Sequence, residues 1–231
     1  MKLKEFFVKD FGALGDGVTN DGFAICDAVQ AAIKYGGPAV IHFEKATYRI
    51  TEIPTENNKR CLFSLSNVQD LSIKGNNATL LFKGAIKLLS MVDCARCSLD
   101  GFVIDYSPKP FVLGKVADFS IEDAYIDFDT QDDLGLKSDV YTPNPPCFGL
   151  PNRRDIRYHY FFERFEQLAD NKYRINIRKN TVDRMKKLTI GDEFILPYIP
   201  CSHNAGGACT LFSNDGFTIS NLRFYSHPEF G

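Results

Sequence analysis

Residues 8–21 read VKDFGALGDGVTND, and this glycine-rich stretch decides the fold that the sequence predicts. Gly12, Gly15 and Gly17 allow tight turns at places where a side chain would clash. At the end of the stretch, Asn20 or Asp21 is the expected N-cap of a helix. The stretch lacks the alternating acids and the terminal Glu of a calcium loop. We therefore interpret it as a turn that leads from a first strand into a helix.

The residues after this turn have the apolar periodicity of one helix followed by two strands. Gly36-Gly37 is expected to end the helix in a left-handed cap. Residues 39–43 and 47–50 are then short strands around a turn. The predicted inward face of the helix consists of Ala24, Ala28, Val29, Ala32 and Ile33.

This order of elements resembles the opening segment of the pectate-lyase-like superfamily of right-handed parallel β-helices. Polygalacturonases, related glycoside hydrolases and many phage tailspikes share that segment. The resemblance implies an all-β protein in which an N-terminal α-helix caps the open end of a β-helix. Four positions depart from the family pattern, where Thr, Gly, Pro and Gly are usual: Gly22, Pro38, Glu44 and Ala46. These departures fall in turns and leave the predicted fold unchanged.

Three internal repeats support a solenoid of stacked coils. They cover residues 71–80, 97–106 and 217–226, and the first two are 26 residues apart, a suitable length for one coil. Each follows an Asn or Asp at an expected turn, namely Asn67, Asp93 and Asn214. The alignment places Ile73, Leu99 and Ile219 in one interior column, and Ala78, Ile104 and Phe224 in another. The 20 Phe residues of the chain suit stacked apolar layers inside such a β structure.

The third repeat begins 120 residues after the second, which indicates an insertion. We predict β-helix coils in residues 1–107, an inserted domain in 108–200 and resumed, truncated coils in 201–231. The insertion reads as a small antiparallel β-barrel, with a hairpin turn at 170–172 and a long loop from Asp129 to Asn152. Its expected strands are 111–119, 124–128, 158–165, 173–177 and 193–196.

A β-helix interrupted early by a small barrel is similar to the bacterial α-1,3-galactosidases of glycoside hydrolase family 110. The phrases at 104–116 and 191–194 carry this resemblance, which is otherwise architectural. It implies an inverting glycoside hydrolase that acts on α-galactosidic or related linkages without a cofactor.

Inverting hydrolases use two carboxyl groups, and on a β-helix such groups come from matching positions of adjacent coils. No acidic column is present here, because the alignment gives Asp105 only Thr79 and Tyr225 as neighbours. Asp100 likewise has only Lys74 and Ser220. Residues 225–231 resemble the Asn-Ser-Pro-x-x-His turn of polygalacturonases, after which that family's catalytic aspartates follow. We therefore expect the catalytic residues to lie beyond Gly231 and this chain alone to be inactive.

Four residues are candidates for contact with a sugar substrate: His227, Glu229, His203 and Asp105. His227 and Glu229 lie nearest the expected site. His203 stands where the chain re-enters the helix, and a role at that junction is the alternative. His42, in the first coil, is expected to be structural.

Composition excludes several classes of function. A net charge of −2 gives no positive electrostatic field that would attract nucleic acid, and no apolar run is long enough to span a membrane.

Cys94 and Cys97 have the spacing of a zinc or redox half-site, but no second pair accompanies them. We expect buried core thiols and no metal. The N-terminus has no signal peptide, so the protein is either intracellular or has lost its signal; because the resemblance implies secretion, we expect a secreted or periplasmic protein.

Three readings of function remain open. The first is the inverting glycoside hydrolase. The second is a polygalacturonase or lyase that degrades pectin or another polyuronate. The third is a tailspike or adhesin module that binds glycans. All three have an oligo- or polysaccharide as partner, and the sequence does not choose the sugar or the oligomeric state.

Overall fold

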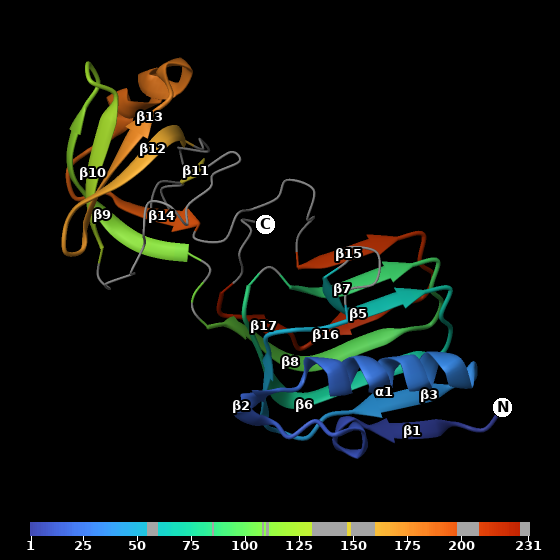
Figure 1. Cartoon of the computed structure of the whole chain (residues 1–231). Coiled ribbons are helices and arrows are strands. Elements are labelled where there is room, and N and C mark those ends of the chain that lie inside the picture. The colour runs from blue at the N-terminus through green and yellow to red at the C-terminus, as the bar shows by residue number, and fades with distance from the viewer. Residues whose placement is uncertain are drawn as a thin grey trace. The chain divides into compact units, whose positions relative to one another are not determined.

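The computed structural model describes two compact units of the chain (Figure 1). Unit 1 comprises Met1–Lys109 and Gly206–Gly231, and unit 2 comprises Pro110–Ala205. Both consist mostly of β-strands, with parallel sheets in unit 1 and an antiparallel sheet in unit 2. The described residues are 1–54, 60–84, 86–107, 109, 111–130, 147–148, 160–197 and 208–226.

Unit 1 is built from three ladders of parallel strands. The first ladder has the order β1 (Lys4–Phe7), β3 (Ala39–His42), β6 (Leu71–Phe82), β8 (Ser98–Tyr106) and β16 (Thr218–Ser220). The second joins β2 (Asp16–Asn20), β4 (Thr47–Ile50), the far halves of β6 and β8, and β17 (Arg223–Phe224). The third has the order β5 (Cys61–Ser66), β7 (Lys87–Val92) and β15 (Cys209–Phe212).

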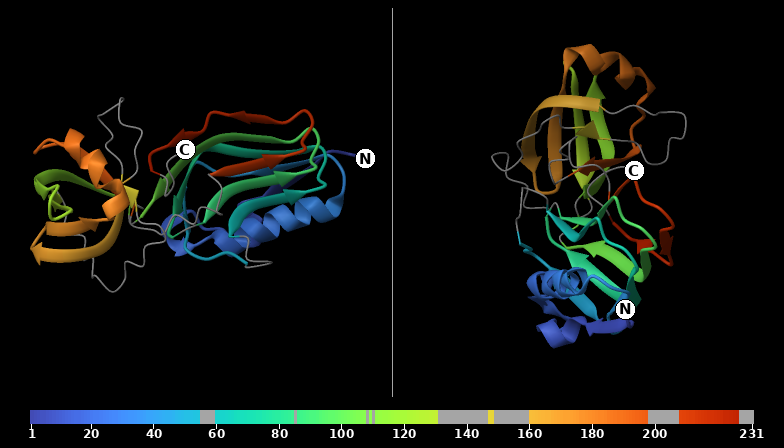
Figure 2. Two further views of the ribbon diagram at one scale, coloured as in Figure 1. Left: turned by 90° about the horizontal axis from the view of Figure 1, so that it is seen from above. Right: turned by 90° about the vertical axis from the view of Figure 1, so that its right-hand side faces the viewer.

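The chain visits the three ladders in the same order on each pass, as a parallel β-helix does. One pass is β3, β4 and β5, and the next is the two halves of β6 followed by β7. After unit 2, β15 returns to the edge of the third ladder beside β7. The views of Figure 2 show these strands running side by side in unit 1. The predicted parallel coils are thus present, while their right-handed winding stays a prediction.

The strand register confirms one interior column and corrects the other. Ile73 pairs with Leu99, and Leu99 pairs with Ile219, as the repeats predict. Ile104, however, pairs with Leu80 and not with Ala78. The first repeat is two residues longer at its bend, because Asn76 and Asn77 both take positive φ where β8 needs only one such residue.

Aromatic rings fill the interior between the ladders. Phe43 packs edge-on against Phe102, with ring centroids 5.0 Å apart, and against Phe63 at 6.1 Å. One layer further along, Phe82 stacks on Tyr106 at 5.3 Å. All five rings are almost completely buried, so the predicted stacking of phenylalanines inside the fold is confirmed.

The glycine-rich stretch begins with a short 3-10 helix, η1 (Val8–Phe11). The helix α1 (Gly22–Tyr35) follows directly after the stretch. Its buried face includes Ile25, which the sequence analysis missed, while Ala24 and Ile33 are only partly buried. Gly36 ends α1 at φ 69°, the predicted left-handed cap. The helix contacts β1, β3, β4 and β5, but its role as the cap of the β-helix stays a prediction.

Asp21 occupies the N-cap position of α1, as one of the two predicted residues, and its carbonyl accepts the Ile25 amide at 3.0 Å, but its side chain does not cap the helix. The Asp21 side chain makes no hydrogen bond to the helix; its carboxylate accepts the amide protons of Leu14 at 2.7 Å and Gly15 at 3.2 Å. Asn20 Oδ1 instead accepts the Gly22 amide at 3.4 Å. Burial raises the pKa of Asp21, although the amides oppose that effect. The Asp21 carboxylate therefore stabilises the glycine-rich turn and not the first turn of α1.

Unit 2 is an antiparallel sheet in the order β11 (Cys147–Phe148), β12 (Tyr160–Ala169), β13 (Lys172–Ile177), β10 (Tyr125–Thr130), β9 (Phe111–Ser120) and β14 (Glu193–Pro197). A 3-10 helix, η2 (Lys179–Lys187), follows β13 and was not predicted. Ala169 pairs with Lys172, which confirms the hairpin turn at 170–172. Most of the expected loop from Asp129 to Asn152 lies outside the described residues. The loop prediction is wrong at its described residues, because Asp129 and Thr130 end β10 and Cys147–Phe148 form β11. The edge strands β11 and β14 contact each other without pairing among the described residues, so a closed barrel stays a prediction.

Gly22 explains one departure from the family pattern and yields a test. A Cβ on Gly22 would overlap the Glu52 carbonyl oxygen and lie 2.9 Å from the Ile53 side chain. Replacing a helical glycine by alanine normally stabilises a helix by about 0.5–1 kcal/mol. We expect Gly22→Ala instead to lower the free energy of unfolding by about 1–3 kcal/mol, measured by urea denaturation. An unchanged or raised stability would contradict the close approach, and Ala31→Gly reports the ordinary helix cost.

The two units predict a pattern of proteolysis. The domain boundaries at 108 and 201 lie outside the described residues, so they stay predictions. We expect limited trypsin or subtilisin digestion to cut first near these boundaries and to leave two resistant sets of fragments, identified by mass spectrometry. Early cleavage within β6 or β8, with the boundaries intact, would contradict the division into units.

Candidate functional site

The outward faces of the unit 1 ladders carry the polar side chains of adjacent coils in rows. In the first ladder, Lys74, Asp100 and Ser220 occupy one row, as the repeat alignment predicts. Asp100 Oδ1 accepts hydrogen bonds from Ser220 Oγ at 2.7 Å and Asn221 Nδ2 at 2.6 Å. These bonds lower the pKa of Asp100. The row thus presents an ionised carboxylate beside an ammonium group on a regular surface.

The same row begins at His42, whose ring is held on two sides. It stacks on Phe7 with centroids 4.9 Å apart, and its Nε2 lies 3.2 Å from Glu5 Oε1. The register pairs His42 with Lys74 on the next strand. These contacts agree with the expected structural role of His42.

A second polar group gathers around Asp105, at the end of β8. The Asp105 carboxylate accepts hydrogen bonds from Lys109 Nζ at 2.6 and 2.7 Å, from Ser226 Oγ at 2.5 Å and from the Tyr106 amide at 2.8 Å. Ser226 is only 5% exposed, and its Oγ also accepts the Tyr106 amide at 3.0 Å. The re-entry of the chain after unit 2 therefore completes this group.

The electrostatics of the Asp105 group favour a permanent charge. Burial by itself raises the pKa of Asp105, but the hydrogen bonds from Lys109, Ser226 and the Tyr106 amide together lower it below the ordinary value. A general acid in glycoside hydrolysis needs a raised pKa. Asp105 is therefore suited to accepting hydrogen bonds from a substrate or a neighbour, and unsuited to donating a proton at neutral pH.

No pair of facing acids is present on adjacent coils of the described ladders. Asp105 pairs with Leu81 on β6, which corrects the predicted neighbour Thr79 by the two-residue shift described above. Asp100 has only Lys74 and Ser220, as predicted. Within the part of the chain that the structure describes, no three His, Cys, Asp or Glu residues lie close enough to hold a metal ion.

The other three candidate residues, His203, His227 and Glu229, lie outside the described residues. Ser226, the last described residue, directly precedes His227 in the sequence. Sequence reasoning missed Ser226 and Lys109 as partners of Asp105. Lys109 had a signal, because it stands four residues after Asp105, but Ser226 is 121 positions away and only the strand register reveals it.

The Cys94 and Cys97 thiols are free and buried, each 2% exposed. Cys94 Sγ donates to the Val92 carbonyl at 3.4 Å, and Cys97 Sγ to that of Ala95 at 3.5 Å. Burial raises the pKa of Cys97. They are core thiols, as expected, and not accessible nucleophiles.

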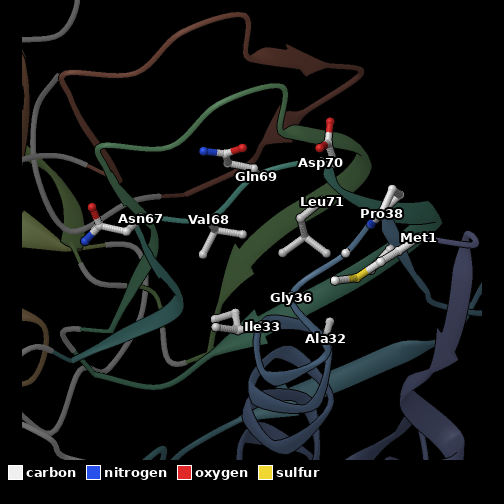
Figure 3. A pocket seen from close by; sticks show the side chains of 12 residues that line it. Met1, Ala32, Ile33, Gly36, Pro38, Asn67, Val68, Gln69, Asp70 and Leu71 are labelled. Atoms are coloured by element: carbon white, nitrogen blue, oxygen red, sulfur yellow. The ribbon is translucent and has the colours of Figure 1, made fainter.

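A hollow of about 430 Å³ lies between the end of α1 and the turn that precedes β6 (Figure 3). In Figure 3 the Val68 and Leu71 side chains point toward α1, whereas the Asp70 carboxylate points away from it. That carboxylate is bound by Arg96 Nε at 2.6 Å and Nη2 at 2.8 Å. The hollow therefore has mixed walls, with the polar side chains of Asn67 and Gln69 beside the apolar ones, and the Asp70 carboxylate is already engaged by Arg96.

No helix in the described part of the chain is long and apolar enough to cross a membrane.

Comparison with known proteins agrees with the β-helix and changes the expected chemistry. Residues 6–61 match the family model described as rhamnogalacturonase A/epimerase, pectate lyase-like. The chain is 28% identical over 188 residues to "Alginate lyase 7" of Azotobacter vinelandii, an alignment that covers 81% of this chain and 19% of that protein.

Two further relatives match shorter stretches. "Mannuronan C5-epimerase AlgE5" of Azotobacter vinelandii is 42% identical over 66 residues, which is 28% of this chain and 6% of that protein. "Plasmin and fibronectin-binding protein A" of Streptococcus pneumoniae is 46% identical over 46 residues, 20% of this chain and 6% of that protein. The chain thus spans at most about a fifth of these relatives. The family model supports the pectate-lyase-like superfamily, and the two Azotobacter relatives are named as alginate enzymes and not as α-galactosidases of glycoside hydrolase family 110.

The depressed pKa of Asp105 predicts a pH-dependent contribution to stability. The contribution is present above the pKa of an unfolded Asp, about 3.9, and is lost as the pH falls through the lower folded value. We expect Asp105→Asn to lower the free energy of unfolding by about 1–3 kcal/mol at pH 7, and the difference from wild type to shrink below about pH 4. Urea denaturation from pH 7 to pH 2.5 measures this, with Asp123→Asn as the exposed control. A difference that is constant across this range would contradict the charged hydrogen-bonded group.

Proposed function

We propose that this chain is part of a carbohydrate-active β-helix enzyme that acts on an anionic polysaccharide, with polyuronates such as alginate as the leading substrate class. The observation that carries this proposal is the similarity to a protein named alginate lyase over 81% of the chain. The matching stretch named for a mannuronan C5-epimerase points to the same class. The parallel coils of unit 1 support it, because they offer regular outward rows to an extended polymer.

Lyase and C5-epimerase chemistry on a uronate share their first step. A base removes the proton at C5, next to the carboxylate, and a cation neutralises the charge that develops on that carboxylate. Elimination then expels the substituent at C4, whereas epimerisation returns a proton to the opposite face of C5. An enzyme of this kind needs a cation, a base and a proton donor near one sugar.

The described residues supply cations and acceptors for such a substrate. Lys74 stands on the open row of the first ladder beside Asp100, and Lys109 stands at the end of the second ladder beside Asp105. We assign these groups to binding and orientation. His203, His227, Glu229 and Asp105 remain proposals for substrate contact, and we assign neither the base nor the proton donor to a described residue.

A glycoside hydrolase acting on α-galactosidic linkages is the second candidate function. The observation that favours it is the interruption of the parallel coils by the antiparallel unit 2, which resembles the architecture of glycoside hydrolase family 110. The lack of facing acids on the described ladders does not support it. A glycan-binding module is the third candidate, and the one relative named here as a binding protein is named for plasmin and fibronectin and not for a glycan. In each case a polymeric substrate fits secretion, which we also propose.

Exchange of the C5 proton with solvent tests the leading proposal. We expect the whole protein that the source gene encodes to introduce deuterium at C5 of mannuronate residues when it is incubated with alginate in D2O, as measured by NMR. Both elimination and epimerisation pass through loss of this proton, so the test does not depend on which one follows. As part of the same proposal we expect residues 1–231 alone to give no exchange above buffer, because neither Asp100 nor Asp105 faces a second acid on the described ladders.

Two parallel assays make the outcome decisive. Polygalacturonate reports whether a different uronate is preferred, and p-nitrophenyl α-galactoside reports hydrolysis. Release of p-nitrophenol by the whole protein without exchange on either uronate would replace the leading proposal by the glycoside hydrolase. Exchange by residues 1–231 at the rate of the whole protein would place the catalytic residues within this chain.

A further inference from the structure

A corner of unit 1 contains a cavity of about 610 Å³. Its walls come from the N-terminal turn of α1, the turn after β4, the residue before β5 and the turn between β6 and β7. Pockets for small ligands occupy about 300–1,000 Å³, so a sugar unit fits this volume. The residues that matter for the argument are Phe23, Thr51, Glu52, Arg60 and Lys83.

Main-chain hydrogen bonds between coils hold the walls of this cavity. Asn20 Oδ1 accepts the amides of Thr51 at 2.9 Å and Glu52 at 3.2 Å. The Lys83 amide donates to the Ile50 carbonyl at 2.8 Å, and the Arg60 carbonyl accepts the Lys87 amide at 2.8 Å. The two cations are therefore fixed at their backbones by different coils of the same corner.

Arg60 and Lys83 are cations without a carboxylate partner among the described residues. Lys9, Arg96 and Lys109, also in unit 1, are each bound to an acid of the described part at 2.5 or 2.6 Å. By contrast, neither Arg60 nor Lys83 takes part in a salt bridge there, although Glu52 lines the same cavity. Among the described residues of the lining, two unpaired cations thus accompany one carboxylate.

Two further features of the cavity favour an anionic sugar as its ligand. The Phe23 ring, 46% exposed, lines the cavity and offers an apolar surface on which the face of a sugar ring can stack. Phe23 also belongs to the first turn of α1, a 14-residue helix whose positive dipole end favours an anion. The Glu52 carboxylate and the Thr51 hydroxyl can accept hydrogen bonds from the hydroxyl groups of a sugar. A fully ionised inorganic anion has no such hydroxyl donors.

We propose that this corner cavity is a binding subsite for one uronate unit of an anionic polysaccharide. The carboxylate of the sugar binds Arg60 and Lys83, the ring packs on Phe23, and the hydroxyls bond to Glu52 and Thr51. The subsite lies one coil before the Asp105 group, because Ile86, in its wall, accepts a hydrogen bond from Tyr106 Oη at 2.9 Å. The subsite is a place where the substrate class of the proposed function would contact the chain. The identity of the polymer rests on that proposed function.

Calorimetric titration of the whole chain with a tetrauronate tests the subsite. We expect tetramannuronate or tetragalacturonate to bind and neutral maltotetraose not to bind. Arg60→Gln with Lys83→Gln removes both cations, and we expect the affinity to fall at least tenfold, since each charge-assisted bond to a carboxylate is among the stronger hydrogen bonds. The matched control, Lys34→Gln with Lys45→Gln, removes the same charge from exposed positions elsewhere in unit 1, and we expect its affinity to stay within twofold of wild type.

Two more measurements separate a uronate subsite from a general anion site. We expect Phe23→Ala to weaken tetrauronate binding and to leave the binding of inorganic phosphate unchanged. We also expect the amide NMR signals of Thr51 and Glu52 to shift on titration with tetrauronate. All variants are compared by circular dichroism, and since the substituted side chains are exposed, we expect them to fold.

The outcomes distinguish this inference from the proposed function. The subsite is overturned if the double variant binds tetrauronate within twofold of wild type, if maltotetraose binds equally well, or if phosphate binds as tightly as the sugar. Turnover of polyuronate by the whole protein together with unaltered binding by the double variant would sink the subsite and keep the function. Loss of binding in the double variant without polyuronate turnover would keep the subsite and sink the function.

Discussion

The structure of unit 1 depends on the close stacking of one coil on the next. Parallel strands in a ladder lie about 4.8 Å apart, so each inward side chain must fit directly above its counterpart. Ile41, Ile73, Leu99 and Ile219 meet this requirement in one column. At the bend, Gly75 meets it by having no side chain, because a Cβ there would lie 2.5 Å from the Gly101 carbonyl oxygen.

This stacking also creates the candidate site. It brings side chains that are far apart in sequence into outward rows, where Lys74 faces Asp100 and Asp105 meets Ser226. The coil that follows unit 2 stacks on the earlier coil in the same way. The Asn214 side chain accepts a hydrogen bond from the Cys94 amide and donates one to the Met91 carbonyl. Binding groups on such a surface are set by register, and a polymer that lies along it would meet several coils at once.

Much of the fold could be predicted from sequence because its signals are local. The glycine-rich turn, the helix that ends at Gly36 and the alternating strands of unit 2 each occupy a short stretch with a fixed period. The misses arose where a distant contact decides. Asp21 is the N-cap residue by position, but its side chain binds the glycine-rich turn and not the helix. Leu80 rather than Ala78 pairs with Ile104, because two asparagines lengthen one bend. The Asp105 group, completed from 121 residues away, had no local signal for Ser226, and the two cations of the corner cavity come from separate turns.

The central claim is that the chain leaves the β-helix, forms unit 2 and returns to add the next coil on the same edge. Amide hydrogen exchange in residues 1–231 and in a chain ending at residue 205 tests it directly. The Asp93 and Arg96 amides donate to the Phe212 and Asp215 carbonyls, which follow unit 2 in the sequence, whereas the Asp70 amide donates to the Ala95 carbonyl, which precedes unit 2. The account predicts that Asp93 and Arg96 lose protection in the shorter chain while Asp70 stays protected. Equal protection of Asp93 and Arg96 in both chains would contradict the return of the chain to this edge.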